Sequence, residues 1–274
     1  FLAVAAARGW PLHHMDVHNA FLHGDLDEEV YMITPPRFRT QGSSKVYRLQ
    51  KSLYGLEQAP RKWFAKLSSK LTEYEFVRSY ADYSLSIYRK GTIFMALLVY
   101  VDDLVLMGNN DEACSNFKRY LNDCFRIKDL GPLKYFLGIE VARNAQGVFL
   151  NQRKYALELI DECGLLGAKP TDFPMDTNHK LALSNSKPLC NAEQYRRLIG
   201  KLIYLTITRP EIAYAVHILS QFMQAPKAAH LEAATRVLRY LKGSAGKGLL
   251  LSSHCDLQLY AYCDSDWGGM SSYT

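Results

Sequence analysis

The sequence has no C-x-x-C pair, no long apolar run, and no internal repeat or low-complexity tract. Its six cysteines are scattered, which argues against a zinc site or a compact disulfide framework and favours a reducing, intracellular setting. The longest apolar run, residues 93–101, falls short of the roughly 18 residues that a membrane-spanning helix needs. We therefore expect a soluble chain with no membrane partner.

The composition is that of an ordinary globular protein. The 274 residues are 48% hydrophobic and 22% charged, enough for one large domain or two ordinary ones. The net charge of +6 suggests a polyanionic partner such as nucleic acid, although a modest excess is also common in proteins without one. The chain begins at Phe1 and "FLAVAAARGW" lacks the basic flank of a signal peptide, so we expect an internal piece of a longer polypeptide.

Strand-like and helix-like patterns alternate in the first half of the chain. A short strand is expected to end near Asp16, followed by an acidic, turn-prone patch at residues 23–30 and a surface loop at residues 34–44. Pro60 is suited to the first turn of a helix whose apolar stripe begins with Trp63.

Helical patterns dominate the second half of the chain. One amphipathic helix covers residues 195–205, a second starts at Pro210, and a third runs from Pro226 to Gly243. The third carries a stripe of cations at every third residue, namely Arg236, Arg239 and Lys242. A solvated face is favoured over contact with phosphates for such a stripe.

The stretch "LLVYVDDLVLMG" places Asp102 and Asp103 inside an apolar run. Its residues predict two strands, Thr92–Tyr100 and Leu104–Met107, joined by a tight turn. A polar turn is the simpler interpretation, since Asp tolerates turn geometry. The alternative is a site for Mg²⁺, because a largely buried carboxylate is costly unless it is paired or bound to metal. Asp16, at the end of its strand, would supply a third carboxylate, although such a residue is more often a cap or turn former.

Longer sequence motifs around these aspartates help to decide between the polar turn and the Mg²⁺ site. Four motifs occur in the order and approximate spacing of a copia-type retrotransposon reverse transcriptase, which they resemble: "MDVHNAFLHGDLDEEVYM", "KSLYGLEQAPRKWF", "LLVYVDDLVLMG" and "LKYFLGIEVAR". Two motifs nearer the C-terminus resemble the stretch that joins polymerase to ribonuclease H in that family: "YRRLIGKLIYLTITRPEIAYAV" and "AATRVLRYLKGSAGKGL". Several long words in register are a strong signal, so the resemblance favours a metal-binding role for the aspartates.

The resemblance implies an α+β fold, the polymerase right hand. Residues 1–142 would form the palm with partial fingers, the upstream fingers being absent, and residues 143–251 a helical thumb and connection. Residues 255–274 would begin a truncated ribonuclease H domain, with Asp264 in its first strand as one carboxylate of an incomplete site. We therefore expect no ribonuclease H activity, and weakened nucleotide binding without the upstream fingers.

The resemblance also implies residue roles. Asp16 and Asp102 would bind two Mg²⁺ ions, with Asp103 completing the catalytic cluster and Mn²⁺ as a possible substitute. The reaction would be attack of a primer 3′-hydroxyl on the α-phosphate of a deoxynucleoside triphosphate (dNTP). Phe21 resembles the aromatic plate under the sugar, although spacing alone also allows an ordinary core residue. Gly138 resembles the primer grip, although a strand glycine can instead mark a bulge.

A further motif would close over the incoming nucleotide and template. Its matching positions are Gly55, Gln58, Pro60 and Arg61. The sequence departs from the family at Glu57, where a lysine is usual, and an anion facing a triphosphate would repel it.

The expected partners are a template-primer duplex of RNA or DNA, dNTP, and the rest of a Pol polyprotein, with integrase upstream and ribonuclease H downstream. The expected location is the cytoplasm, in a virus-like particle, with the nucleus as the alternative.

Two other functions remain open. A catalytically silent relic of a retrotransposon would still bind nucleic acid through its basic helices. A two-metal nuclease is disfavoured, because His13 and His14 are interpreted as strand-edge positions and no histidine is expected beside an aspartate.

Overall fold

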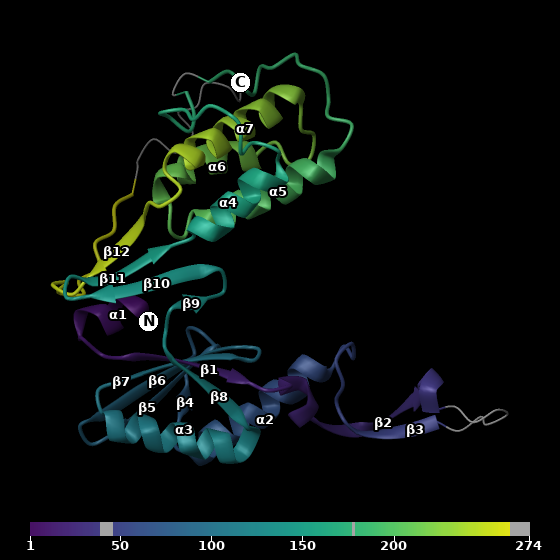
Figure 1. Ribbon diagram of the computed structural model, residues 1–274, viewed down its shortest axis with the longest axis vertical. Helices are drawn as coiled ribbons and strands as arrows, with labels where there is room; N and C mark the ends of the chain where they lie inside the picture. The colour runs from purple at the N-terminus through teal and green to yellow at the C-terminus, as the bar shows by residue number, and fades with distance from the viewer. Residues whose placement is uncertain (39–45, 177–178, 264–274) are drawn as a thin grey trace. The chain divides into compact units, whose positions relative to one another are not determined.

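The chain folds into two compact units in the computed structural model, which describes residues 1–38, 46–176 and 179–263. The sheet unit is Arg8–Leu133, and the helical unit joins Phe1–Ala7 to the chain from Lys134 onward (Figure 1). Helices and antiparallel strands build both units, which confirms the α+β class. The finer division into palm, fingers and thumb stays a prediction.

The sheet unit is built on a six-stranded antiparallel sheet in the order β4-β5-β6-β7-β1-β8. The strands are β1 (Leu12–Val17), β4 (Val77–Arg78), β5 (Leu85–Lys90), β6 (Ile93–Tyr100), β7 (Asp103–Gly108) and β8 (Ile127–Pro132). The hairpin predicted from the apolar run is thus confirmed as β6 and β7, except that Asp103 belongs to β7 and not to the turn. Strand β1 lies between β7 and β8, so its residues are interior to the sheet.

Two helices, α2 (Ala59–Glu73) and α3 (Asp111–Phe125), complete the core of the sheet unit (Figure 1). Helix α2 carries Pro60 in its first turn and buries Trp63, Leu67 and Leu71 of the predicted stripe, whereas the fourth member, Tyr74, is only partly buried at the C-cap. Helix α3 begins where the side chain of Asn110 accepts a hydrogen bond from the backbone N–H of Ala113 at 2.8 Å. Both helices pack in one apolar cluster with strands β1, β6 and β7.

Residues 25–30 of the acidic patch belong to a strand, and only residues 23 and 24 lie outside it, which corrects the prediction of a turn. After the short 3-10 helix η1 (Ala20–His23), β2 (Asp25–Ile33) pairs with β3 (Val46–Lys51) in a two-stranded ribbon. Cations on α2 neutralise the acidic strand, since Nζ of Lys62 lies 2.6 Å from Oδ2 of Asp27. The expected loop at 34–44 connects β2 and β3 and contains η2 (Pro36–Phe38); residues 39–45 lie outside the described residues.

The helical unit combines a second sheet with a group of packed helices (Figure 1). Its sheet has the order β12-β11-β10-β9, formed by β9 (Tyr135–Phe136), β10 (Ile139–Asn144), β11 (Gly147–Asn151) and β12 (Gly248–Ser252). Its helices are α1 (Leu2–Ala7), α4 (Arg153–Glu162), α5 (Ala192–Leu205), the 3-10 helix η3 (Pro210–Ile212), α6 (Ala213–Ser220) and α7 (Ala228–Gly243). The three predicted helices of the second half are therefore confirmed. No described helix is long and apolar enough to cross a membrane.

The cations of α7 bind backbone carbonyls of the loop that follows α4, which neither interpretation of this stripe foresaw. Nε of Arg239 donates to the carbonyl of Lys169 at 2.7 Å, and Nζ of Lys242 donates to that of Ala168 at 2.7 Å. Arg236 forms an ion pair with Asp176 at 3.0 Å. The stripe therefore ties the loop to the helix.

The predicted divisions of the chain, between residues 142 and 143 and at the start of the ribonuclease H segment, fall on described residues. Residues 142 and 143 both lie within β10, whereas the two compact units divide between Leu133 and Lys134. The strand expected to begin a ribonuclease H domain is not formed over residues 259–263, which are exposed and without regular secondary structure. Asp264 and the remainder of that expected strand lie outside the described residues.

Candidate active site

Asp16 and Asp103 face each other across strands β1 and β7. They are directly opposed in the antiparallel register of these strands. Met15, Val17 and Leu104 point into the core with α2 and α3, so the alternation of side chains places both aspartates on the opposite face of the sheet. Asp102 lies in the adjoining turn, immediately before Asp103, and its carbonyl accepts a hydrogen bond from the backbone N–H of Val17 at 2.9 Å.

The turn that carries Asp102 is anchored by helix α2. Val101 and Asp102 are its two central residues, since Tyr100 pairs with Asp103. Val101 has a φ of 55°, in the left-handed region that a β-branched residue rarely adopts. The indole N–H of Trp63 donates to its carbonyl at 2.7 Å, and that ring is only 2% exposed, packed edge-on against Phe125. Trp63 therefore holds a strained turn in position.

A histidine lies beside one of the aspartates, contrary to the sequence prediction. Nε2 of His14 is 2.8 Å from Oδ1 of Asp103, and both side chains are partly buried. The interpretation of His13 and His14 as strand-edge positions is also wrong, because β1 is interior to the sheet. Residue spacing could not reveal the contact, since 89 positions separate the pair. The argument that disfavoured a nuclease is therefore removed.

His13 points to the other face of β1, toward α3. Its Nε2 atom is buried, and the described residues offer it no hydrogen-bond partner. Burial lowers the pKa of His13, and the nearby Lys118 lowers it further. His13 is therefore a neutral, structural histidine near pH 7.

Carboxylate oxygens are the ligands that Mg²⁺ prefers, so the donor chemistry of Asp16, Asp102 and Asp103 fits a hard divalent cation. Across residues 1–38, 46–176 and 179–263, however, no three His, Cys, Asp or Glu side chains are placed together to hold a metal. Asp103 instead accepts a hydrogen bond from His14. The backbone brings the aspartates to one place, and their side chains would have to rotate to share an ion.

Phe21 lines a cavity of 270 Å³ at the same turn. The other lining residues come from α2 (Pro60, Trp63 and Phe64), from strand β6 (Val99) and from turns beside the strands (Tyr83, Ser84 and Val101). The ring of Phe21 lies 4.8 Å from that of Tyr54, centroid to centroid. Two residues predicted for nucleotide contact, Phe21 and Pro60, thus share one cavity with Val101, the neighbour of Asp102. Trp63, expected only as a core residue, is the functional candidate that the sequence did not single out.

The remaining predicted nucleotide contacts lie in the segment between β3 and α2 and in the first turn of α2. Gly55 has a φ of 94°, a conformation that favours glycine, and Gln58 immediately precedes α2. Arg61 is exposed on the first turn of α2. Glu57, which departs from the family pattern, is exposed as well.

Gly138 belongs to the helical unit, in the turn between β9 and β10. It has a φ of 82°, and the hydroxyl of Tyr204 donates to the carbonyl of the preceding Leu137. A Cβ atom on Gly138 would lie 3.7 Å from the Tyr204 ring, an ordinary contact. The positive φ therefore explains the glycine, and its role as primer grip stays a prediction.

The whole chain resembles known transposon proteins. Residues 1–177 match the sequence model of the family described as reverse transcriptase (RNA-dependent DNA polymerase). The chain is 43% identical over 269 residues to the retrovirus-related Pol polyprotein from transposon RE1 of Arabidopsis thaliana, covering 98% of the chain and 18% of that protein. It is 35% identical over 283 residues to the corresponding polyprotein from transposon TNT 1-94 of Nicotiana tabacum, covering 98% of the chain and 21% of that protein.

A shorter relative is matched over most of its own length. The chain is 33% identical over 261 residues to a putative transposon Ty5-1 protein of Saccharomyces cerevisiae, covering 93% of the chain and 84% of that protein. The chain therefore belongs to the reverse transcriptase (RNA-dependent DNA polymerase) family, in the copia-type group of transposon Pol polyproteins, as its motifs predicted.

Proposed function

We propose that this chain is the polymerase module of a copia-type retrotransposon and extends a primer by RNA-directed DNA synthesis. The observation that carries the proposal is the direct opposition of Asp16 and Asp103, with Asp102 in the adjoining turn. Nothing in the packing of the sheet requires two facing carboxylates, because they lie on the face away from the core with α2 and α3. Like charges at this distance are costly unless a cation or donor compensates them.

The three aspartates would hold two Mg²⁺ ions, or Mn²⁺ in their place. When bound, such ions stabilise the charge that develops on the attacking and leaving oxygens at phosphorus. The primer 3′-hydroxyl would pass its proton to solvent water and its oxygen would bond to the α-phosphorus of the dNTP, while the bond to the bridging oxygen breaks and pyrophosphate leaves.

The residues of this chain would act mainly by positioning. Trp63 and the paired strands keep Asp102 beside Asp16 and Asp103, so the backbone needs little reorganisation once the aspartate side chains have turned toward a bound ion. Phe21 and the cavity of 270 Å³ next to Val101 would receive the sugar of the nucleotide. Gly55, Gln58 and Arg61 would contact the triphosphate or the template, and Gly138 the primer.

We extend the proposal to the whole element through the relatives. The chain spans about a fifth of the RE1 and TNT 1-94 polyproteins. Its partners would then be the template-primer duplex, dNTP and the other Pol segments. Its place would be a cytoplasmic particle or the nucleus.

A catalytically silent, nucleic-acid-binding relic is the second candidate. Two observations favour it: the exposed anion at Glu57, and the absence of any described set of three metal-binding side chains already in place.

The decisive experiment is primer extension on poly(rA) annealed to oligo(dT) with Mg²⁺. The purified chain is compared with Asp102→Asn and with Asp123→Asn, which removes an exposed carboxylate from α3. We expect incorporation by the native chain and the α3 variant, and none by Asp102→Asn. Primer-template binding in a gel shift without incorporation by any of the three would support the relic, and failure to bind would refute both candidates.

A further inference from the structure

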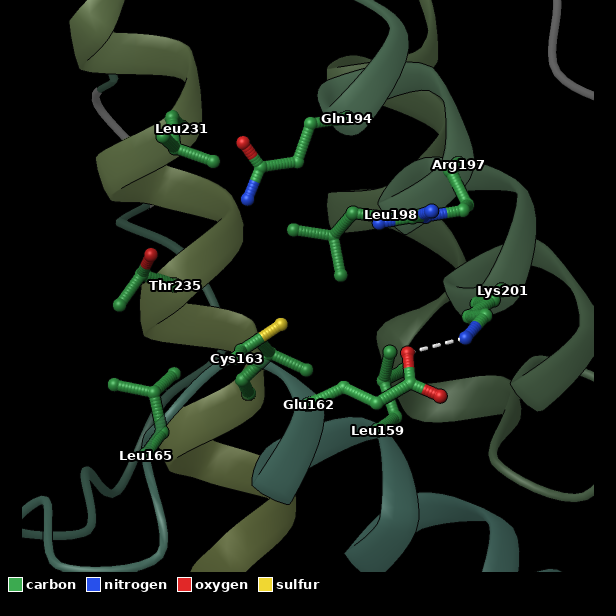
Figure 2. Close-up of a pocket in the computed structure, with 11 residues that line it drawn as sticks. Leu159, Glu162, Cys163, Leu165, Gln194, Arg197, Leu198, Lys201, Leu231 and Thr235 are labelled. Atoms are coloured by element: carbon green, nitrogen blue, oxygen red, sulfur yellow. Dashed lines mark hydrogen bonds and ion pairs between the residues drawn. The ribbon is translucent and has the colours of Figure 1, made fainter.

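A cavity of 470 Å³ lies within the helical unit, between α4, α5 and α7 (Figure 2). Small-molecule sites usually measure about 300–1,000 Å³, so the cavity is large enough for a compact organic ligand. None of its residues takes part in the polymerase chemistry proposed above. Five of them lie in the two motifs nearer the C-terminus, which gave no indication of a binding site.

Leucines form the apolar wall of this cavity. Leu159, Leu198 and Leu238 are buried in the helical core, while Leu165 and Leu231 are only partly covered. Figure 2 shows Leu198 of α5 and Leu231 of α7 pointing into the space between the two helices. A ligand that covers the partly exposed leucines would gain the free energy of apolar burial.

The polar wall carries one uncompensated positive charge. Lys201 is paired with Glu162, the interaction drawn as a dashed line in Figure 2. Arg197, one helical turn before Lys201, has no carboxylate partner among the residues that the structure describes. Gln194 and Thr235 add neutral hydrogen-bonding groups. Two cations and one carboxylate therefore leave the cavity with a preference for an anion.

We propose that this cavity binds a small amphipathic anion, with its apolar body against the leucines and its carboxylate or sulfonate group against Arg197. A guanidinium offers two parallel N–H donors, which match the two oxygens of such a group. A purely apolar ligand would leave Arg197 unpaired, and an inorganic anion would leave the leucine wall uncovered. The site is independent of the polymerase function.

Cys163, an exposed residue in the lining of the cavity, provides a reporter. Its thiol belongs to the lining, and Figure 2 shows the sulfur directed toward the space between α5 and α7. Burial raises the pKa of Cys163, Glu162 reinforces the shift, and Lys201 and Arg197 oppose it. The raised pKa should slow the reaction of the thiol at mildly alkaline pH without preventing it, and a bound ligand would cover the thiol. Cys255 is exposed outside the cavity and serves as an internal control.

The test uses two fluorescent probes that differ in a single group. The sulfonate probe is 8-anilinonaphthalene-1-sulfonate, and its neutral counterpart is N-phenyl-1-naphthylamine. We expect Arg197→Gln to weaken binding of the sulfonate about tenfold and to change binding of the neutral probe less than about twofold. Arg153→Gln, which removes an exposed cation outside the cavity, is expected to change neither.

Two further measurements locate the site. Thr235→Phe should fill the cavity and abolish binding of both probes, with circular dichroism showing that the variant is folded. In the native chain, the sulfonate should slow iodoacetamide alkylation of Cys163 at least about fivefold, read by peptide mass spectrometry, and leave Cys255 unchanged. The proposal is overturned if the native chain does not bind the sulfonate, if Arg197→Gln weakens both probes equally, or if Cys163 is not protected.

Discussion

Nε2 of His14 on β1 lies 2.8 Å from Oδ1 of Asp103 on β7. Asp103 pairs directly with Asp16, so His14, two residues before Asp16 on β1, reaches Asp103 diagonally. An ionised carboxylate can only accept a hydrogen bond, so His14 donates from Nε2 in this pair. The contact fixes the orientation of one member of the aspartate group. In a metal site, hydrogen bonds to the ligand carboxylates are part of the arrangement that orients them.

This contact predicts different effects for two substitutions of His14. His14→Leu should lower the kcat of primer extension about tenfold and raise the Mg²⁺ concentration needed for half-maximal activity, because Asp103 loses its donor. His14→Gln should stay within about threefold of the native chain, because an amide N–H can replace Nε2–H. Equal effects of the two substitutions, measured by steady-state extension across a Mg²⁺ titration, would show that the donor has no such role.

The local features of this site could be predicted from the sequence, whereas the contacts between distant segments could not. The β-branched and aromatic run around Asp102 predicts β6 and β7 because strand preference is local. The pairing of β1 with β7 joins residues some 90 positions apart, so neither the opposition of Asp16 and Asp103 nor the position of His14 follows from spacing. The motif resemblance indicated that the aspartates act together, and only the sheet register brings them together.

Charged segments were the least predictable. Residues 23–30 resemble a turn because they are acidic, yet residues 25–30 belong to β2, where Asp27 forms an ion pair with Lys62 of α2. The cations of α7 suggested a solvated face, yet Arg239 and Lys242 donate to loop carbonyls from residues more than 60 positions earlier. In both cases a tertiary partner, absent from the local sequence, determines what the charge does.

Replacing Trp63 tests the anchoring of the catalytic turn. Trp63→Phe keeps an aromatic ring but removes the N–H that donates to the carbonyl of Val101 and leaves part of the ring volume empty. We expect the free energy of unfolding to fall by about 1–3 kcal/mol, measured by urea denaturation. Tyr80→Phe, at a side chain that is 93% exposed, is the matched control and should change it by less than about 0.5 kcal/mol. An unchanged stability of Trp63→Phe would contradict the proposed anchor.

Gly108 at the end of β7 is required by a close approach to Cys114. A Cβ atom at this position would lie 2.6 Å from Sγ of Cys114 and 3.1 Å from the carbonyl oxygen of Phe94. Gly108→Ala should therefore cost about 1–3 kcal/mol of stability. Adding Cys114→Ala removes the closest atom. The double variant should therefore lose less stability, by about 1 kcal/mol, than the sum of the losses of the two single variants. Additive effects in this cycle would mean that Phe94 or Met95, whose nearest atoms both lie 3.1 Å from the added Cβ, sets the limit and not Cys114.

The thiol of Cys114 also predicts a loss of stability in alkali. Burial raises its pKa from 9.0 to about 11. Between these values the folded chain retains a proton that the unfolded chain has lost, so stability is fully present below pH 9 and falls as the pH rises toward 11. From pH 8 to about pH 10.5 the native chain should lose about 2 kcal/mol more than Cys114→Ala in reducing buffer. Parallel pH profiles of the two proteins in urea denaturation would show that the thiol does not titrate in this way.

Glu57 offers the most direct test of nucleotide binding near α2. The residue is exposed, close to Gly55 and to the start of α2, at a position where the motif usually carries a lysine. Restoring the cation with Glu57→Lys replaces repulsion of a triphosphate by attraction, so the KM for dTTP on poly(rA)/oligo(dT) should fall about three- to tenfold at low salt. Because exposed charges are screened, the gain should shrink as the ionic strength approaches 1 M. Glu232→Lys makes the same charge change at an exposed position on α7 and separates a local effect from one of net charge. If both variants lower the KM equally, the cation at position 57 acts only through overall charge; if only Glu57→Lys does so, the segment before α2 faces the triphosphate.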